Sequence, residues 1–195
     1  MIPLCVDLDG TLIRGDTLWL SLRAVMAQGI RPTLHIPWTF LTGGRAQLKD
    51  WLTTRYLPDP AQLPYHLEVV SWLCKEKEEG RRLILVTGAH RILADGVALH
   101  TGIFHEVIAT SNGYNMSGLL KARELVRRFG ENGYDYAGNS YVDIPVWQCA
   151  RNIIIVNASR RVATEARQIG QVEKEFSRPL ATGSFRAATD HVDPQ

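Results

Sequence analysis

Two carboxylates stand one residue apart at the end of the first apolar run of this chain, LCVDLDGTL at residues 4–12. If the run is a buried strand, Asp7 and Asp9 emerge at its carboxyl end, the edge where open α/β sheets bind ligands. Carboxylates placed there repel each other unless a cation joins them, and Mg²⁺ takes oxygen ligands and shares its site with substrate phosphates. An ordinary Asp-Gly turn is the alternative, and this stretch alone does not choose between the two.

Apolar runs alternate with amphipathic segments along the second part of the chain. The runs predict strands at 2–8, 82–88, 105–110, 134–137 and 152–156. The segments between them predict helices at 91–101, at 119–129, through Trp147 and at 160–169. This alternation is typical of an α/β fold, in which a parallel sheet of about five strands is flanked by helices.

The first two predicted strands are much farther apart in sequence than a simple crossover requires. Helical spacing and turn residues between them predict helices at 18–28, 33–42, 45–55 and 65–79. We therefore predict a small helical cap at 15–63, inserted after the first strand of a core formed by residues 1–14 and 64–176. Residues 177–195, rich in Thr, Ala and Asp, are expected to be a flexible tail.

Composition excludes several classes of protein. The 195 residues are 45% hydrophobic, which is sufficient for one sizeable core, and the net charge of +2 comes from intermixed acids and bases without a basic block for nucleic acid. The three scattered cysteines predict no disulfide framework and favour a reduced cytosol. No apolar run is long enough to span a bilayer, and we expect no signal peptide before the aspartates. We expect a cytoplasmic protein, or one peripheral to the inner face of a membrane.

Four short elements occur in order at the predicted strand ends: DLDGT at 7–11, LVTG at 85–88, Lys121 at the start of a helix, and GNSYVD at 138–143. The set resembles the haloacid dehalogenase superfamily of phosphotransferases, whose core is a Rossmann-like sheet. Within it the chain resembles the phosphoserine-phosphatase-like group, whose cap lies between the first and second motifs. It is also similar to the phosphatase-like domain associated with UbiA-type polyprenyl transferases, through residues 7–16, 63–65 and 134–138.

The resemblance implies roles for the first motif. Asp7 would attack phosphorus in line and form an aspartyl phosphate, which water then hydrolyses. Asp9 would protonate the leaving oxygen and later activate the water. Gly10 would let the chain turn away from the phosphate.

The second and third motifs would bind the phosphoryl group. The resemblance implies that the hydroxyl of Thr87 and backbone N–H groups near Gly88 donate hydrogen bonds to phosphoryl oxygens. Lys121 would offset the charge of Asp7 and of the phosphoryl group. Taken alone, Thr-Gly after a strand is usually a turn, and a single lysine in the first turn of a helix is usually solvated.

A Mg²⁺ site would be formed by Asp7, Asp9 through its carbonyl, Asn139 and Asp143, with Asp143 bound directly or through water. Asp143 is also a candidate helix N-cap. Family members usually carry aspartate where this chain has Asn139, and an amide oxygen brings no charge. We therefore expect Mg²⁺ to bind more weakly here than in a relative with four carboxylates.

These roles predict a Mg²⁺-dependent phosphomonoesterase that acts on a small or polyprenyl-linked phosphate. Apolar residues of the cap, among them Trp38, would line the substrate pocket. The alternative is a catalytically weak phosphate-binding or partner module that serves a membrane prenyl-type or phosphoribosyl transferase, which Asn139 favours. Another reaction of the superfamily, such as phosphomutase chemistry, stays open, whereas the second aspartate argues against a dehalogenase.

Overall fold

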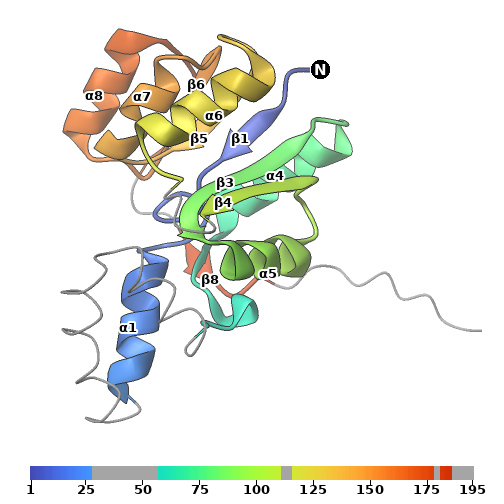
Figure 1. The fold of residues 1–195 in the computed structure, drawn as a ribbon, viewed down its shortest axis with the longest axis vertical. Coiled ribbons are helices and arrows are strands. Elements are labelled where there is room, and N and C mark those ends of the chain that lie inside the picture. Colours follow the sequence, from blue (N-terminus) through green and yellow to red (C-terminus); the bar gives the residue numbers. More distant parts are fainter. Residues whose placement is uncertain (28–56, 111–115, 178–180, 186–195) are drawn as a thin grey trace, which may run out of the picture.

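In the computed structural model, a six-stranded parallel sheet forms the centre of the molecule (Figure 1). The structure describes residues 1–27, 57–110, 116–177 and 181–185. In sheet order the strands are β4 (Glu106–Thr110), β3 (Leu83–His90), β1 (Leu4–Val6), β5 (Asp135–Gly138), β6 (Asn152–Val156) and β7 (Gln171–Phe176). The predicted α/β class is confirmed, with six strands in the sheet rather than about five.

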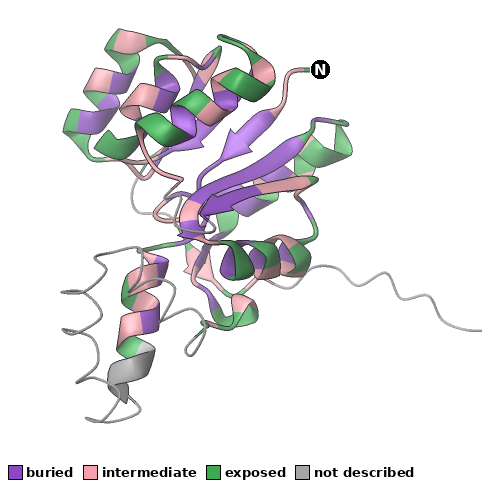
Figure 2. Ribbon diagram, viewed as in Figure 1, coloured by how far each residue is buried: buried purple, intermediate pink, exposed green. Residues whose placement is uncertain are grey.

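Helices cover both faces of the sheet, because residues along each strand alternate between two separate cores. Leu4 and Val6 of β1 face α4 (Leu67–Glu78) and α5 (Arg91–Thr101), whereas Cys5 faces the opposite group of helices. That group consists of α6 (Leu119–Phe129), α7 (Ile144–Trp147) and α8 (Arg160–Ile169). The inner strands β1, β3, β5 and β6 are almost entirely buried between the two layers (Figure 2).

Several predicted bounds agree with the structure. Helices α5, α6 and α8 and strand β6 begin and end at the predicted residues. Strand β1 is shorter than predicted, and β3 continues through Gly88 to His90. The helix predicted through Trp147 consists of a 3-10 turn, η2 (Tyr141–Asp143), followed by α7. The predicted helices at 33–42 and 45–55, with Trp38, lie outside the described residues.

The sixth strand, β7, was not predicted. Its sequence, QVEKEF, is mostly charged, and four of its six residues are exposed. Among the described strands it lies at the edge of the sheet and pairs with β6 alone. An edge strand buries little of its surface, so the apolar alternation that marks a strand is weak here.

Part of the segment predicted as a flexible tail, residues 181–185, contains a short strand. Thr182 and Gly183 form β8, which pairs with β2 (Tyr65–His66) in a small antiparallel sheet. The ring of Phe185 packs near those of Tyr65 and His100, and its carbonyl oxygen lies 2.6 Å from Nε2 of His100. Tyr65 and His66 are therefore a short strand before α4 rather than its first turn.

The segment predicted as a cap leaves and rejoins the core at a single point. The N–H of Arg14 donates to the carbonyl of Pro64 at 2.8 Å, and Ile13 forms a β-bridge with Tyr65. Beyond Arg14 the chain enters α1 (Thr17–Ala27), whose first turn is capped by the carboxylate of Asp16. Most of residues 15–63 lie outside the described part, so the division into core and cap stays a prediction.

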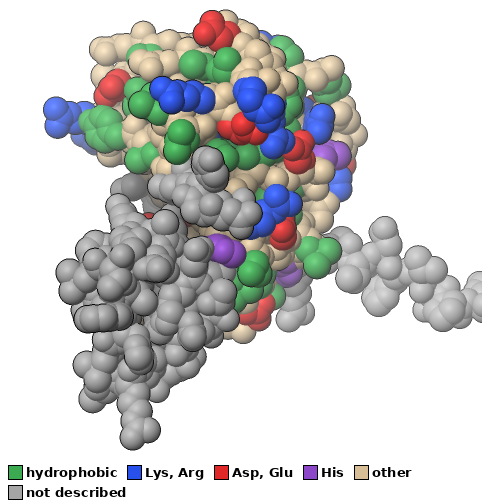
Figure 3. All heavy atoms as spheres, in the orientation of Figure 1, with side chains coloured by type: hydrophobic (Ala, Val, Ile, Leu, Met, Phe, Trp, Pro, Cys, Tyr) green, Lys and Arg blue, Asp and Glu red, His purple; other side chains and the backbone are tan. Residues whose placement is uncertain are grey.

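The described surface carries mixed charge. Figure 3 shows Lys and Arg side chains standing among Asp and Glu side chains on the face in view. Ion pairs such as Arg128–Glu124 and Arg82–Glu106 account for part of this mixture. All three cysteines are free thiols. Within the described ranges, no helix combines the length and the apolar character needed to cross a bilayer.

Candidate active site

Strand register brings three of the four sequence motifs to one edge of the sheet. Val6, the last residue of β1, pairs with Leu85 of β3 on one side and with Ala137 of β5 on the other. Asp7 follows Val6 directly, while Thr87 and Asn139 lie two residues beyond its partners. Because all three strands are parallel, these side chains gather at the carboxyl edge, where open α/β sheets bind ligands.

The fourth motif reaches this edge from α6. Nζ of Lys121, in the first turn of the helix, donates a hydrogen bond of 2.7 Å to Oδ1 of Asp7 and another of 2.7 Å to the hydroxyl of Tyr136. The hydroxyl of Tyr136 in turn donates to Oδ1 of Asp143 at 2.9 Å. The structure therefore brings Asp7, Lys121 and Asp143 together, with Tyr136 between the last two.

Burial makes this group of charges electrostatically strong. Burial raises the pKa of Asp7 to about 7; Lys121 opposes the rise, whereas the charges of Asp143 and Asp9 add to it. Burial alone would lower the pKa of Lys121, but Asp7 and Asp143 outweigh that effect and the pKa lies above its ordinary value. Asp7 and Asp143 thus share the ammonium group of Lys121, with the carboxylate of Asp9 nearby. The site therefore carries surplus negative charge.

Tyr136 stays protonated in this environment. Burial, followed by the charges of Asp143 and Asp7, raises its pKa well above the ordinary value. A protonated phenol can accept one hydrogen bond and donate another, as it does here between Lys121 and Asp143. Sequence reasoning did not select Tyr136, because its importance depends on a pairing between β5 and α6 that no local pattern reveals.

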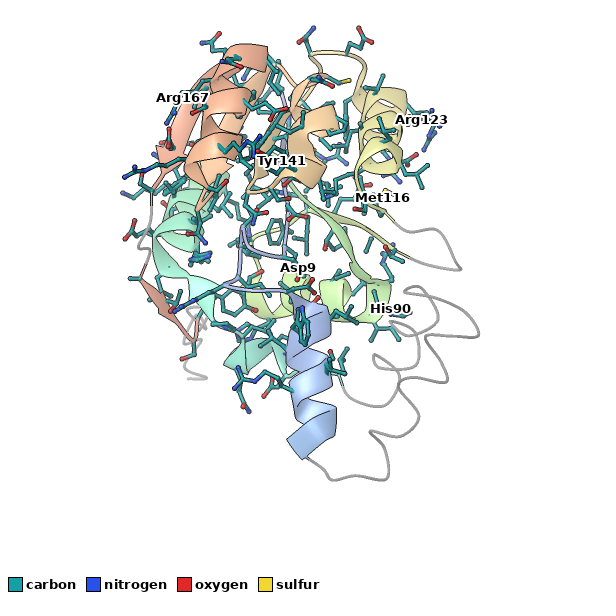
Figure 4. All side chains as sticks on the ribbon, turned by 90° about the vertical axis from the view of Figure 1, so that its left-hand side faces the viewer. Asp9, His90, Met116, Arg123, Tyr141 and Arg167 are labelled. Carbon is teal, nitrogen blue, oxygen red and sulfur yellow. The ribbon has the colours of Figure 1, made fainter. Side chains whose placement is uncertain are left out.

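The carboxylate of Asp9 turns toward the first helix of the predicted cap. Its Oδ1 accepts the backbone N–H of Thr17 at 2.8 Å, and its Oδ2 accepts the hydroxyl of Thr17 at 3.3 Å. Figure 4 shows Asp9 just above the start of α1. Thr17 is buried, and its contact with the predicted general acid is a second feature that the sequence did not reveal.

Thr87 lies at the end of the regular pairing of β3 and is wholly buried. Its hydroxyl oxygen accepts the N–H of Ala89 at 2.9 Å, so the O–H can still donate to another group. Thr110 of β4 donates its hydroxyl to the carbonyl of Gly88 at 2.9 Å, which holds the Thr87–Gly88 turn against the neighbouring strand. This turn has the donors that the predicted phosphate-binding role needs.

Asn139 packs directly over the first motif. A Cβ added to Gly10 would lie 2.0 Å from Nδ2 of Asn139, and Gly10 has a φ of +79°. Only glycine satisfies both the close approach and the left-handed backbone at this position. The loops that follow β1 and β5 are therefore in contact through Gly10 and Asn139.

Asp143 makes a dense set of protein hydrogen bonds. Its Oδ2 accepts the backbone N–H groups of Asn139 and Ser140, each at 3.0 Å, and the hydroxyl of Ser140 at 3.1 Å. A Cβ at Gly138 would lie only 2.9 Å from the same oxygen. The free coordination positions of Asp143 are therefore on Oδ1, which already accepts from Tyr136.

The donor set at this edge suits a hard divalent cation. Asp7 and Asp143 offer carboxylate oxygens, Asn139 an amide oxygen, and Asp9 its main-chain carbonyl, and Mg²⁺ prefers oxygen ligands. The surplus negative charge around Lys121 favours a cation as well. Among the described His, Cys, Asp and Glu side chains, no three gather into a metal-binding cluster.

Fold and site together define a Rossmann-like α/β protein with a buried aspartate–lysine pair at the carboxyl end of β1. Residues 4–148, well over half of the chain, match the model of the family described as haloacid dehalogenase-like hydrolase. The chain therefore belongs to the haloacid dehalogenase-like hydrolase family.

A curated relative of similar sequence is the uncharacterized protein y4nM of Sinorhizobium fredii (strain NBRC 101917 / NGR234). It is 32% identical over 170 residues, which cover 87% of this chain but 32% of y4nM. The chain thus spans about a third of the length of that relative.

Three solved structures share the fold over most of this chain. The first is a protein of unknown function from Bordetella pertussis Tohama I (TM-score 0.63, 16% identity, covering 88% of this chain and 97% of that one). The second is CbbY from Rhodobacter sphaeroides in complex with phosphate (TM-score 0.60, 16% identity, covering 90% of this chain and 94% of that one). The third is a phospho-aspartyl intermediate analogue of phosphoserine phosphatase (TM-score 0.53, 13% identity, covering 95% of this chain and 94% of that one). At these identities the likeness shows the fold, and the link to UbiA-associated domains remains a prediction.

Proposed function

We propose that this protein is a Mg²⁺-dependent phosphomonoester hydrolase that works through an aspartyl phosphate on Asp7. The observation that carries the proposal is the buried pair of Asp7 and Lys121, 2.7 Å apart, at the carboxyl end of the central strand. Membership of a hydrolase family and structural likeness to phosphatases support the same reaction class.

In the proposed reaction, a carboxylate oxygen of Asp7 attacks phosphorus, and the bond from phosphorus to the leaving oxygen breaks. Asp9 supplies the proton that the leaving oxygen takes up. Water then attacks the phosphorus of the aspartyl phosphate, Asp9 accepts its proton, and inorganic phosphate leaves as the carboxylate of Asp7 is restored. Asp9 must release or share its contact with Thr17 to reach the leaving group.

The remaining residues would bind and neutralise the phosphoryl group. Lys121 would offset negative charge beside Asp7, and the Thr87 hydroxyl and backbone near Gly88 would donate to phosphoryl oxygens. Mg²⁺, held by Asp7, the Asp9 carbonyl, Asn139 and Asp143, would supply positive charge that stabilises the ionised nucleophile and the phosphoryl oxygens. We propose a small or lipid-linked phosphate as the substrate class.

The proposal is tested by release of phosphate from p-nitrophenyl phosphate with Mg²⁺ and with EDTA. We expect metal-dependent turnover by the natural chain and none by Asp7→Asn. Acid quenching during turnover of a radiolabelled phosphoester should leave label on the natural protein and not on the variant. Turnover that is equal in EDTA, or that survives in Asp7→Asn, contradicts the mechanism.

The amide at position 139 gives a separate expectation for the cation. Because Asn139 brings no charge, Asn139→Asp should lower the Mg²⁺ concentration for half-maximal activity by about tenfold, since one further carboxylate would face the ion. The measurement is a Mg²⁺ titration of activity for both proteins. An unchanged Mg²⁺ requirement would refute the proposed ligand role of this residue.

A second candidate function is a phosphate-binding or partner module with little turnover, serving a membrane prenyl-type transferase. Two observations favour it: Asp143 has one oxygen filled by three protein donors, and Asp9 is bonded to Thr17. Calorimetric titration with orthovanadate separates the two functions. Binding of vanadate without any turnover of p-nitrophenyl phosphate supports the module, and binding with turnover supports the hydrolase.

A further inference from the structure

One lysine in the site has two carboxylates within reach. Nζ of Lys121 lies 2.7 Å from Oδ1 of Asp7 and 3.9 Å from Oδ1 of Asp143, and all three side chains are buried. A shift of about an ångström would replace one ion pair by the other. Something must therefore hold the ammonium group on Asp7, because a lysine paired with Asp143 would leave the nucleophile without its counter-charge.

The hydroxyl of Tyr136 lies where it can determine whether Lys121 pairs with Asp7 or with Asp143. It accepts a hydrogen bond from Lys121 and donates one to Oδ1 of Asp143, so it occupies the oxygen that the ammonium group would otherwise bind. Each neighbour thereby has a hydrogen-bond partner, and the longer 3.9 Å ion pair between Lys121 and Asp143 does not need to shorten. A buried charge that lacks such a partner is costly, which gives both contacts weight.

The ring that carries this hydroxyl is held on all sides. Tyr136 lies on β5 between Cys5 and Ile153 of the neighbouring strands, and its side chain is in the buried core beneath α6 and α7. Its backbone carbonyl accepts the indole N–H of Trp147 at 3.2 Å. A Cβ at Gly138 would lie 2.9 Å from the ring, so that glycine lets the ring lie close to the backbone. The hydroxyl is thus fixed by the sheet rather than by the groups it bonds.

We propose that Tyr136 is a positioning residue, whose hydroxyl keeps Lys121 on the nucleophile Asp7 by occupying Asp143. It does not touch the reacting atoms, and it acts through the lysine. Its kinetic consequence rests on the proposed function, because only a phosphoryl-transfer reaction needs Lys121 beside Asp7. Its structural consequence, the position of the lysine, is independent of any activity.

The test compares two Tyr→Phe substitutions on the same stretch of chain. Tyr136→Phe removes the hydroxyl and leaves the ring, the backbone contact with Trp147 and the packing in place. Tyr134→Phe is the matched control: Tyr134 is equally buried, and its hydroxyl donates to the carbonyl of Val146 at 3.0 Å, away from the site. Both variants lose one buried hydroxyl, so their difference isolates the two contacts of the Tyr136 hydroxyl, with Lys121 and with Asp143.

For p-nitrophenyl phosphate at saturating Mg²⁺, we expect Tyr136→Phe to lower kcat by about tenfold or more, since it removes a hydrogen bond to a charged group. KM should change by less than about twofold, and Tyr134→Phe should keep kcat within about twofold. Equal kcat values for the two variants overturn the proposal. A loss that higher Mg²⁺ fully restores also overturns it, because the hydroxyl would then act through the cation rather than through Lys121.

Crystal structures of the two variants supply a readout without turnover. In Tyr136→Phe we expect Nζ of Lys121 within hydrogen-bonding distance of Oδ1 of Asp143, and in Tyr134→Phe we expect the ammonium group still on Asp7. A lysine that stays on Asp7 in Tyr136→Phe overturns the proposal. If the natural chain has no phosphatase activity, the proposed function fails while this comparison still decides the role of Tyr136.

Unfolding provides the remaining measurement should Tyr136→Phe not be obtained in folded form. The double variant Tyr136→Phe/Lys121→Met removes the unmatched ammonium group together with the hydroxyl. Recovery of a folded protein, shown by a cooperative urea transition, supports the coupling of these two residues. A double variant that remains unfolded, while Tyr134→Phe/Lys121→Met folds, overturns it, because Tyr136 would then be needed for packing alone.

Discussion

Asp7 and Asp135 are both buried carboxylates of neighbouring central strands, but they lie at opposite edges of the sheet and have different surroundings. At the amino edge, Asp135 bonds to Arg81, to two nitrogens of Arg151 at 2.9 and 2.6 Å, and to the N–H of Asn152 at 3.0 Å. At the carboxyl edge, Lys121 is the one cationic partner that Asp7 has among the residues the structure describes.

The difference is one of charge balance. Burial alone would lower the pKa of Arg81, but hydrogen bonding to Glu76 and the charges of Glu173 and Asp135 leave it above the ordinary value, so the arginine stays charged. Two arginines therefore neutralise Asp135 within the protein itself. The pKa of Asp7 is instead raised to about 7, chiefly by burial, because one lysine is shared among several carboxylates. The Asp135 cluster is balanced by its own arginines, whereas the proposed function would complete the Asp7 cluster with a cation and a phosphoryl group.

The sharpest way to separate the two clusters is to make the same substitution in each. Asp7→Asn should lower kcat by at least about a thousandfold, because an amide cannot form the proposed aspartyl phosphate. Its free energy of unfolding should not fall. Phosphate release and urea unfolding are the measurements, and a variant with more than a hundredth of the natural kcat would contradict the assignment of the nucleophile.

Asp135→Asn should show the opposite profile. Loss of the buried charge leaves Arg81 and Arg151 with a weaker partner, and we expect the free energy of unfolding to fall by about 3 kcal/mol. The kcat of the folded fraction should stay within about twofold, because this cluster lies at the other edge of the sheet. Urea unfolding and active-site titration measure the two effects, and a variant of natural stability would show that the cluster does not hold the fold.

Stability of the metal-free protein should depend on pH through Asp7. Its pKa is about 7 when folded and 3.8 when unfolded, so the folded state binds the proton more tightly between these values. This contribution is fully present below pH 4 and is lost as pH rises toward and through 7. Between pH 5 and pH 8 the natural chain should lose roughly 2 kcal/mol relative to Asp7→Asn. If the urea midpoints of the natural chain and of Asp7→Asn changed with pH in the same way, the raised pKa of Asp7 would be refuted.

A smaller effect is expected where the carboxyl edge meets α1. Thr17→Val removes the hydroxyl that bonds Asp9 at 3.3 Å and keeps the backbone N–H that bonds it at 2.8 Å. We expect kcat to change by about fivefold, with a shift in its pH profile, because the acid loses one of its two hydrogen bonds from Thr17. Ser21→Ala is a control from the same helix, since the Ser21 hydroxyl bonds only the carbonyl of Thr17 among the contacts found. If kcat depended on pH in the same way in Thr17→Val and Ser21→Ala, the Thr17 hydroxyl would have no role in the proposed mechanism.

The smallest effect tests how far the amino-edge cluster depends on its outer member. Arg151 is about half exposed, with 44% of its side-chain surface accessible, although it bonds Asp135 through two nitrogens. Solvent screening limits such a pair, so Arg151→Gln should cost less than about 1 kcal/mol in the free energy of unfolding. Arg81→Gln, at a buried position, should cost clearly more. Equal losses would contradict the view that burial sets the strength of this cluster.

Residues whose role is written in a local pattern could be predicted from the sequence. The strand bounds of β6, the helices α5, α6 and α8, and the gathering of Asp7, Lys121 and Asp143 at one edge all follow from periodicity and from ordered motifs. Once the strands are known to be parallel, their carboxyl ends must share an edge. The metal and phosphate roles of these residues stay predictions.

Residues whose role depends on a partner elsewhere in the fold could not be found in this way. Tyr136 reads as one more apolar residue of a buried strand, and its hydroxyl acquires a function only when α6 places Lys121 beside it. Thr17 reads as part of a helix cap until its contact with Asp9 is seen. The charged edge strand β7 lacks the alternation that would have marked it, because only one of its edges pairs with a neighbour.

The hydrogen bond between Arg14 and Pro64 has a consequence for how such a chain can diversify. A segment that departs and returns through adjoining residues closes its own loop at the base, and the entropy of closing a loop grows only with the logarithm of its length. The segment between these two positions can therefore become longer, shorter or different in sequence while β1, Asp7 and Asp9 keep their positions. The contact between Arg14 and Pro64 fixes where the segment leaves and rejoins the core, whereas the length and sequence of the segment are free to change.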